Sequence, residues 1–223
     1  MRPRKILKPI LGRVLPHLAG WYLRKPRKSR FQGVEVLVQP GVFHPGLFLS
    51  TRFMMRFLEQ YPLLGSSFLE IGAGSGMISI WAAKRGANVT ATDISEKAIE
   101  NIISNAETNH VDMEVVHSDL FESLPVIDFD YIVINPPYYP GKPKNEAEFA
   151  WYCGPGFEYF HRLFQGLGSY CGEKTQIMMV LSEDCDLKRI KEIAGGSGWK
   201  FEIVHSKKIT GEWNYIFSIH KAS

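Results

Sequence analysis

The tetrapeptide Asn135-Pro136-Pro137-Tyr138 has the residue types and the spacing to hold a planar nitrogen for reaction. It follows the apolar run Tyr131–Ile134, and its prolines lack N–H donors, so that carbonyl groups are left to face a crevice. The side-chain oxygen of Asn135 and the main-chain oxygen of Pro136 can each accept one N–H from an amide or exocyclic amine. These bonds would turn the nitrogen lone pair toward an electrophile and stabilise developing positive charge. Tyr138 offers a flat face to a planar acceptor, and no general base is required.

A second group of residues suits a nucleoside. The run from Glu70 to Gly76, Glu-Ile-Gly-Ala-Gly-Ser-Gly, stands where a predicted strand passes into a helix. Its glycines allow a tight turn that a ligand can approach closely. Asp93 ends the next predicted strand, 21 residues after Gly72, where a carboxylate can accept hydrogen bonds from ribose hydroxyls. Strand, glycine turn, helix, strand and acid in this order predict an adenosine-binding half-fold.

Two adenosine-containing cofactors compete for this half-fold. A dinucleotide favours G-x-G-x-x-G, whereas this chain has G-x-G-x-G preceded by Glu70, whose negative charge suits an ammonium or sulfonium better than a pyrophosphate. The motif resembles the E-x-G-x-G-x-G of the class I, Rossmann-like methyltransferases that depend on S-adenosylmethionine. Glu70, Gly72, Gly74 and Gly76 match that motif, and Asp93 occupies the place of the family's ribose acid.

The resemblance extends to two further positions. Asp119 and Leu120 stand where that family contacts the adenine amino group with an acid and the ring with an apolar side chain. The Asn135–Tyr138 tetrapeptide is similar to that of the subgroup acting on planar nitrogens, namely glutamine amides of release factors and adenine or guanine amines of nucleic acids. The resemblance implies an N-methyltransferase that uses S-adenosyl-L-methionine and acts on a macromolecule. It also places Asn135 in contact with both cofactor and acceptor.

Two adjoining segments bear on the acceptor without deciding it. Ala150–Phe157 resembles the A-x-x-G-G-x-x-G stretch of the glutamine methyltransferases, with Cys153 and Phe157 in two of its glycine positions. Val42–Pro45 resembles their V-x-x-P segment, but Gly46–Thr51 lacks the acidic residue that usually follows it. Glutamine and a nucleobase amine both stay open as acceptors.

These motifs need an α/β frame to position them. From Ser67 onward, short apolar runs alternate with helical patterns, which predicts a mostly parallel sheet covered on both faces. The last two strands have no helix between them and should form an antiparallel hairpin. The expectation is a Rossmann-like, doubly wound, seven-stranded sheet with a C-terminal antiparallel hairpin. The expected strands are Phe68–Ile71, Asn88–Thr92, Met113–His117, Tyr131–Ile134, Gln176–Leu181, Phe201–His205 and Asn214–His220, and the expected helices lie near Met77–Arg85, Glu96–Ala106, Phe157–Leu167 and Cys185–Ala194.

The N-terminal part differs in charge from the rest. Of 223 residues with net charge +3, the first 30 hold ten Lys or Arg and no acid, so the remaining 193 carry 16 basic and 23 acidic residues. We expect a basic amphipathic extension over residues 1–33 and a catalytic domain over residues 34–223. The extension suits either a helix docked on the body or a contact with nucleic acid or a membrane surface. After it we expect a strand over Val34–Val38 and a helix capped by Ser50 or Thr51.

Composition excludes several classes of protein. Three cysteines, none in a C-x-x-C pair, are too few for a disulfide framework or a structural zinc site, and we expect no metal. No run approaches the roughly 18 apolar residues of a membrane span. Pro9, Arg13 and Pro16 interrupt any secretory signal, so we expect a cytoplasmic protein, with a mitochondrial-type transit peptide left open. Two other function classes stay open: a non-catalytic S-adenosylmethionine-binding scaffold or partner subunit, and a nicotinamide-dependent oxidoreductase.

Overall fold

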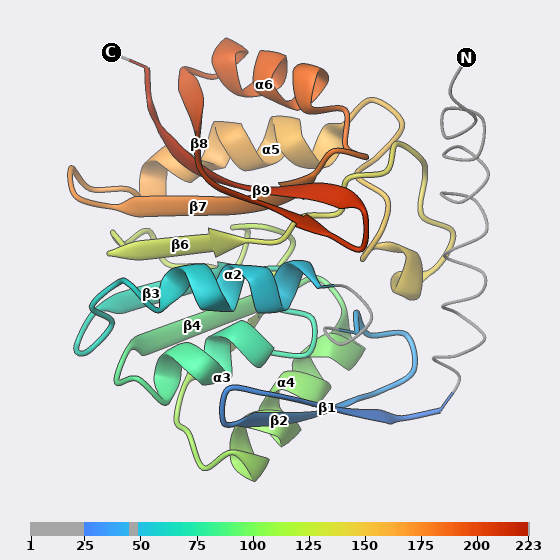
Figure 1. Ribbon diagram of the computed structural model, residues 1–223, viewed down its shortest axis with the longest axis vertical. Helices are drawn as coiled ribbons and strands as arrows, with labels where there is room; N and C mark the ends of the chain where they lie inside the picture. The colour runs from blue at the N-terminus through green and yellow to red at the C-terminus, as the bar shows by residue number, and fades with distance from the viewer. Residues whose placement is uncertain (1–24, 45–48, 223) are drawn as a thin grey trace.

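A computed structural model describes residues 25–44 and 49–222 of the chain. Its main sheet consists of β3 (Ser67–Ile71), β4 (Asn88–Asp93), β5 (Glu114–His117), β6 (Tyr131–Ile134), β7 (Gln176–Ser182), β8 (Trp199–Ile209) and β9 (Glu212–Lys221). The seven strands lie in the order β5-β4-β3-β6-β7-β9-β8 (Figure 1). The first five are parallel, whereas β9 is antiparallel to β7 and to β8. The expected fold class is confirmed, including the C-terminal hairpin.

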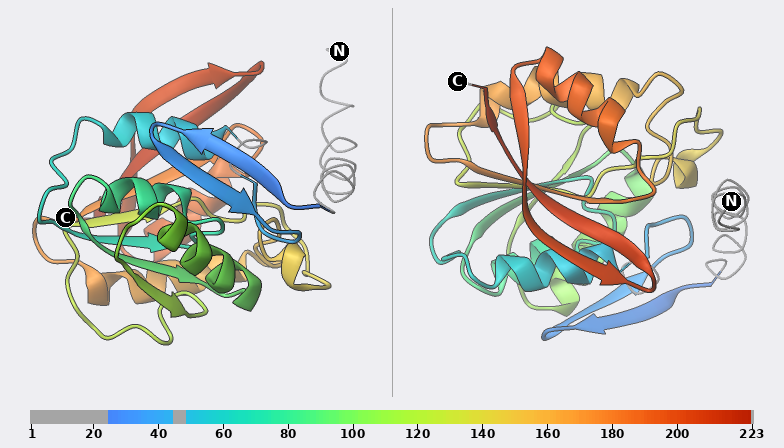
Figure 2. Two further views of the ribbon diagram at one scale, coloured as in Figure 1. Left: turned by 90° about the horizontal axis from the view of Figure 1, so that it is seen from below. Right: turned by 45° about the horizontal axis from the view of Figure 1, so that its top comes forward.

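Helices cover both faces of this sheet (Figures 1 and 2). One face carries α2 (Ser50–Leu58), α3 (Met77–Ala83) and α4 (Glu96–Thr108), and the other carries α5 (Glu158–Gly166) and α6 (Leu187–Gly196). Along β6, Tyr131 and Val133 join the first core and Ile132 and Ile134 the second. Because successive strand residues point to opposite faces, a strand covered on both sides must be apolar throughout. Short 3-10 helices span Glu146–Glu148 and Leu167–Tyr170.

Two helices begin differently from the sequence expectation. The capping position of α2 is Leu49, which makes no side-chain hydrogen bond, so the expected cap by Ser50 or Thr51 is wrong. Thr51 instead lies inside the helix and is buried. At α6, Asp186 accepts a hydrogen bond from the Arg189 N–H at 3.0 Å and so starts the helix two residues after Cys185. Among the helices described, none is long and apolar enough to cross a membrane.

A separate antiparallel hairpin, formed by β1 (Arg27–Phe31) and β2 (Val34–Val38), packs beside α3 and α4 (Figure 2). The strand β1 was not predicted from the sequence, because lysine and arginine dominate its composition. Gln32 and Gly33 join the strands with φ of 47° and 80°, the pair of positive values that a tight hairpin turn needs. The hairpin spans residue 33, the predicted boundary between the N-terminal extension and the catalytic domain. The predicted amphipathic helix lies outside the described residues.

Three asparagines, two in α4 and one at its C-terminal cap, hydrogen-bond to the backbone of β2 and of the residue that follows it. Residues four apart share one face of a helix, and residues two apart share one edge of a strand. The matched pairs are Asn109 with Glu35 N–H (3.2 Å), Asn105 with Leu37 N–H (2.8 Å) and Asn101 with Gln39 N–H (3.2 Å). Asn105 also donates to the carbonyl of Ser75 at 3.0 Å. This asparagine ladder therefore ties the hairpin directly to the glycine turn.

Candidate active site

A cavity of about 260 Å³ opens at the carboxyl ends of β3, β4 and β6. Chain connections leave β3 and β6 toward opposite edges of the sheet, which makes their junction a topological switch point, the usual ligand site of open α/β sheets. Seven predicted site residues line the cavity: Glu70, Gly72, Gly74, Asp93, Asp119, Leu120 and Asn135. Gly76, Pro136 and Tyr138 are not part of this lining. In the described part of the chain, no three His, Cys, Asp or Glu side chains group as a metal site.

The glycine turn adopts a backbone that other residues rarely take. Gly72, Gly74 and Gly76 have φ of 72°, 57° and 76°. A Cβ on Gly74 would lie 3.4 Å from the Cβ of Phe43, and one on Gly76 would lie 3.1 Å from Ile102. Gly76 occupies the capping position of α3. Its role in the turn is therefore to let the helix pack closely against α4, whereas Gly72 and Gly74 form cavity surface.

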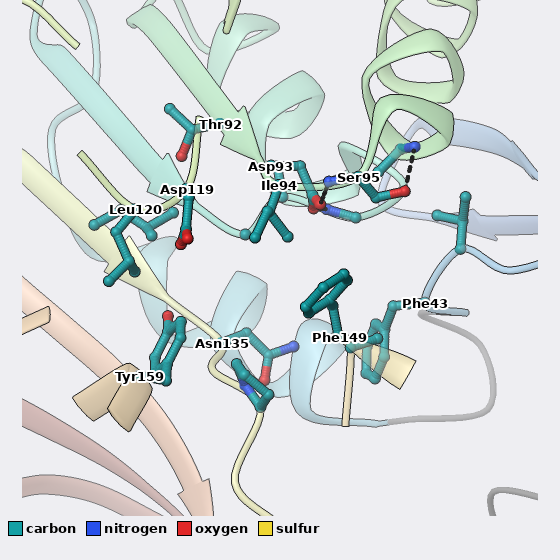
Figure 3. A pocket seen from close by; sticks show the side chains of 18 of the residues that line it. Phe43, Thr92, Asp93, Ile94, Ser95, Asp119, Leu120, Asn135, Phe149 and Tyr159 are labelled. Atoms are coloured by element: carbon teal, nitrogen blue, oxygen red, sulfur yellow. Dashed lines mark hydrogen bonds between the residues drawn. The ribbon is translucent and has the colours of Figure 1, made fainter. Parts of the chain in front are cut away.

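Asp93 is held in place by backbone groups on both sides. Its Oδ2 accepts a hydrogen bond from the Gly74 N–H at 2.8 Å, and its Oδ1 accepts one from the Ser95 N–H at 3.0 Å. Burial raises the pKa of Asp93, and the backbone hydrogen bonds oppose that rise. The carboxylate faces the cavity (Figure 3), and each oxygen keeps a lone pair for a ribose hydroxyl.

Glu70 is buried at the start of the glycine turn. One of its carboxylate oxygens accepts hydrogen bonds from the Ser79 N–H at 2.8 Å and from the Ser79 hydroxyl. Burial raises the pKa of Glu70 to about 8, and the nearby charge of Asp93 adds to the rise. A cation in the cavity would favour the ionised form. The side chain can therefore respond to a cationic ligand while it fixes the first turn of α3.

The far end of the cavity is formed by Asp119 and Leu120 with the first turns of α5. The Asp119 carboxylate pairs with the guanidinium of Arg162, with an N–O distance of 2.8 Å. Leu120 is buried with φ of 55°. Arg162 and Tyr159, both from α5, also line the cavity. These two residues could not be predicted from the sequence, because only the packing of α5 on the sheet brings them to Asp119.

Asn135 enters the cavity from the side opposite Asp93 and Ser95 (Figure 3). Pro137 lines the cavity next to it, whereas Pro136 is buried outside the lining. Tyr138 is half-buried and packs against Tyr139, with ring centroids 4.7 Å apart. Burial raises the pKa of Tyr138 well above its ordinary value. The structure therefore joins Asn135 to the predicted cofactor residues and places the Tyr138 ring elsewhere.

The segment after this tetrapeptide folds back to complete the cavity. Tyr139 N–H donates to Trp151 O at 2.9 Å, and Cys153 N–H donates to Tyr139 O at 2.9 Å. This returns Phe149, Ala150 and Cys153 to the cavity, where Phe149 lies beside Phe43 (Figure 3). His44, which lies next to Phe43, is buried but does not line the cavity.

The donor set fits an adenosine that carries a positive charge. One fixed carboxylate (Asp93) suits ribose hydroxyls, a second (Asp119) suits an amino group, and Glu70 suits the cation. Because Gly74 has no side chain, the space between it and Phe43 stays open to a ligand. In addition, the buried hydroxyl of Tyr159 has no hydrogen-bond partner among the described residues.

The sequence has relatives that carry out one type of reaction. Residues 33–151 match the Methyltransferase small domain family. A proposed protein N5-glutamine methyltransferase of Methanocaldococcus jannaschii is 29% identical over 81% of this chain and 92% of its own length. The ribosomal protein L11 methyltransferase of Thermosipho melanesiensis is 31% identical over 58% of this chain. The chain spans only about half the length of that second relative.

Solved structures with the same fold include enzymes with different acceptors. The E. cuniculi Mtq2–Trm112 complex, responsible for methylation of the eRF1 translation termination factor, has a TM-score of 0.63 and 23% identity over 82% of this chain and 99% of that one. The T. thermophilus 16S rRNA guanine-N2 methyltransferase RsmC, solved with AdoMet and guanosine, has a TM-score of 0.63 and 19% identity. That match covers 89% of this chain and 50% of the other.

Proposed function

The chain belongs to the Methyltransferase small domain family, and from that membership we propose that this S-adenosylmethionine-dependent methyltransferase acts on a planar nitrogen of a macromolecule. The acceptor atom in this proposal is a glutamine amide nitrogen or the exocyclic amine of a nucleobase. The observation that carries it is the position of Asn135, which shares one cavity with Glu70 and Asp93 and lies across it from Asp93.

In the proposed mechanism the chain binds both reactants and orients one nitrogen. Bound S-adenosylmethionine supplies an electrophilic methyl group on a sulfonium. Asn135, which lines the cavity, accepts one N–H of the acceptor through its side-chain oxygen. Pro136 lies just outside the lining, so we propose that the acceptor reaches past Asn135 to donate its other N–H to the main-chain oxygen of Pro136. Both bonds strengthen as the nitrogen gains positive charge, so they stabilise the transition state more than the ground state. The nitrogen then loses one proton to water, and no catalytic base is needed.

Two observations bear on the class of acceptor. The relative from M. jannaschii favours a protein glutamine, the Mtq2–Trm112 complex favours a protein acceptor, and RsmC favours a guanine amine. The Ala150–Phe157 segment resembles that of the glutamine enzymes and returns Ala150, Cys153 and Gly154 to the cavity. On this ground we propose a protein glutamine as the first acceptor to test, with an RNA base as the alternative.

The test compares Asn135→Ala with the unchanged chain. With S-adenosylmethionine labelled in its methyl group and a total cell extract as acceptor, we expect incorporation to fall at least about 100-fold, as for other transition-state hydrogen-bond partners. Affinity for S-adenosylhomocysteine should change little, because Asn135 is only one of many contacts. Protease or nuclease digestion of the labelled product then separates a protein acceptor from RNA.

Asp93→Ala is the matched control on the other side of the cavity. Its loss should weaken cofactor binding about 100-fold, since hydrogen bonds to a charged group contribute about 1.5–3 kcal/mol each. Saturating cofactor should restore its rate but not that of Asn135→Ala. Unchanged incorporation in Asn135→Ala would overturn the mechanism. No incorporation by the unchanged chain, despite tight cofactor binding, would favour a non-catalytic scaffold.

A further inference from the structure

Tyr159 carries a buried polar group that the proposed chemistry does not use. Its hydroxyl oxygen is buried and has no hydrogen-bond partner among the described residues. The residue lies in the first turn of α5 and lines the cavity. Figure 3 shows the ring below Leu120 with its hydroxyl directed toward the end of the cavity where Asp119 lies. A buried hydroxyl without a partner destabilises a protein, so a ligand is the natural partner.

The surroundings of this hydroxyl make it a hydrogen-bond donor. Burial raises the pKa of Tyr159 far above its ordinary value, and the charges of Asp93 and Asp119 raise it further. The phenol is therefore protonated at neutral pH and can donate a hydrogen bond. Asp119 beside it is a pure acceptor when ionised, and Arg162 holds one of its oxygens at 2.8 Å. Tyr159 and Arg162 both belong to α5. This helix therefore supplies the donor, Tyr159, and through Arg162 fixes the position of the acceptor, Asp119.

A donor beside an acceptor matches one kind of base. In a 6-aminopurine the amino group donates, and the ring nitrogens accept. We propose that Tyr159 donates a hydrogen bond to a ring nitrogen of the cofactor's adenine while Asp119 accepts from its amino group. A 6-oxopurine has a carbonyl in place of the amino group and a proton on N1. It would mismatch Asp119 in every case, and it would also mismatch Tyr159 where the accepting ring nitrogen is N1. Tyr159 is then a specificity-determining residue at the adenine end.

The inference concerns the cofactor and does not depend on the acceptor. It rests on the cofactor assignment within the proposed function and on nothing at Asn135. Binding of S-adenosylhomocysteine requires no acceptor. The binding test of Tyr159 can therefore contradict this inference while the transfer test of Asn135 supports the proposed function, and the opposite outcome is equally possible. The two failures are therefore distinguishable.

The first measurement is the affinity of Tyr159→Phe for S-adenosylhomocysteine by calorimetry. We expect binding about tenfold weaker than in the unchanged chain, the size of one lost hydrogen bond. The unfolding midpoint of the ligand-free variant should be equal or higher, because the substitution removes an unpartnered buried hydroxyl. Unchanged affinity would overturn the proposal.

Tyr131→Phe serves as the matched control. The hydroxyl of Tyr131 donates to the carbonyl of Pro62 at 3.1 Å, and the residue does not line the cavity. Its loss should lower the unfolding midpoint and leave affinity unchanged, the reverse of Tyr159→Phe. If both variants lose stability and keep their affinity, Tyr159 has only a structural role.

Deaza analogues of S-adenosylhomocysteine identify the partner atom. The 1-, 3- and 7-deaza compounds each replace one ring nitrogen of the base by carbon. One of them should bind the unchanged chain about tenfold more weakly than the parent compound, yet bind Tyr159→Phe as well as the parent does. If Tyr159→Phe weakens binding but no analogue shows this coupling, the contact to a ring nitrogen is overturned.

Discussion

The two sides of the cavity are held in place by different means. The first wall, residues 70–76 and 93–95, consists of two short turns after neighbouring strands, fixed by single hydrogen bonds such as Gly74 N–H to Asp93. The second wall, residues 135–159, is one long connection from β6 to α5, fixed where Tyr139 bonds to both Trp151 and Cys153. The first wall therefore depends on a bond between turns that follow two different strands, whereas the second depends on a single connection that folds back on itself.

The walls also differ in how they use left-handed backbone. The first wall places Gly72, Gly74 and Gly76 at positive φ. The second places Phe157 there, at φ of 63°, before the first turn of α5. That strain costs about 1–2 kcal/mol, but the Phe157 ring is 9% exposed and packs against Phe160 at 6.2 Å. The comparison shows that the burial of a large side chain can offset the cost of a positive φ at a position where the backbone favours glycine.

The largest effect we predict therefore concerns Phe157. Phe157→Ala should lower the free energy of unfolding by about 4 kcal/mol, because it removes a buried ring and keeps the strained backbone. Phe157→Gly loses the same ring but relieves the strain, so it should be less destabilised than the alanine variant by about 1 kcal/mol. Urea denaturation with a constant m-value measures both differences.

Phe160 provides the control for this pair of variants. It is buried in the same core but lies inside α5, where glycine costs about 1 kcal/mol more than alanine. At Phe160 the glycine variant should be the less stable one. The same order at both positions would contradict the claim that Phe157 stores backbone strain.

The first wall was the more predictable part of the site from sequence. Gly72, Gly74 and Asp93 follow apolar strands at short spacing, so the pattern that predicts the strands also places these residues at the cavity. The mostly parallel sheet and its terminal hairpin could be predicted for the same reason, but the order of the strands within the sheet could not. What the pattern could not give is contact between distant segments. Arg162 and Tyr159 reach the cavity only through the packing of α5.

The misplaced or missed elements have physical causes as well. β1 is rich in lysine and arginine because its outward side chains face solvent, while Ser29 is buried on the inner side. Because three of the five residues of β1 are charged, its alternation of inward and outward side chains could not be recognised as an alternation of apolar and polar residues. Tyr138 follows the last proline, and its ring packs on Tyr139 rather than on the cavity surface. Sequence spacing determined that an aromatic residue stands there but not the direction of its side chain.

The next prediction concerns the acid buried in the first wall. The pKa of Glu70 is about 8 in the folded chain, against 4.5 for an exposed glutamate. Between these values the folded state keeps a proton that the unfolded state has released. Stability from this group is therefore fully present below pH 4.5 and is lost as the pH rises toward 8. We expect the free energy of unfolding to fall by about 3 kcal/mol between pH 5 and 7.5, close to the limit of about 1.4 kcal/mol per pH unit.

Glu70→Gln tests this pH dependence directly. The amide can still accept the hydrogen bonds from Ser79 but does not titrate, so most of the decline should disappear in urea denaturation at a series of pH values. Asp93 remains and, with its own raised pKa, leaves a smaller slope of the same sign. Equal slopes in the two proteins would show that Glu70 is ionised in the folded chain at neutral pH.

The smallest effect we predict asks whether the first wall is supported from outside by the asparagine ladder. Asn105→Ala and Asn109→Ala each leave backbone groups of β2 without their side-chain partner, so both should lose about 1 kcal/mol of unfolding free energy. Only Asn105 also reaches the glycine turn, through the carbonyl of Ser75 at 3.0 Å. Asn105→Ala should therefore bind S-adenosylhomocysteine a few-fold more weakly, whereas Asn109→Ala should bind it as the unchanged chain does. Equal affinity in both variants would mean that the turn keeps its shape through Asp93 alone, and that α4 stabilises the hairpin without positioning the cofactor site.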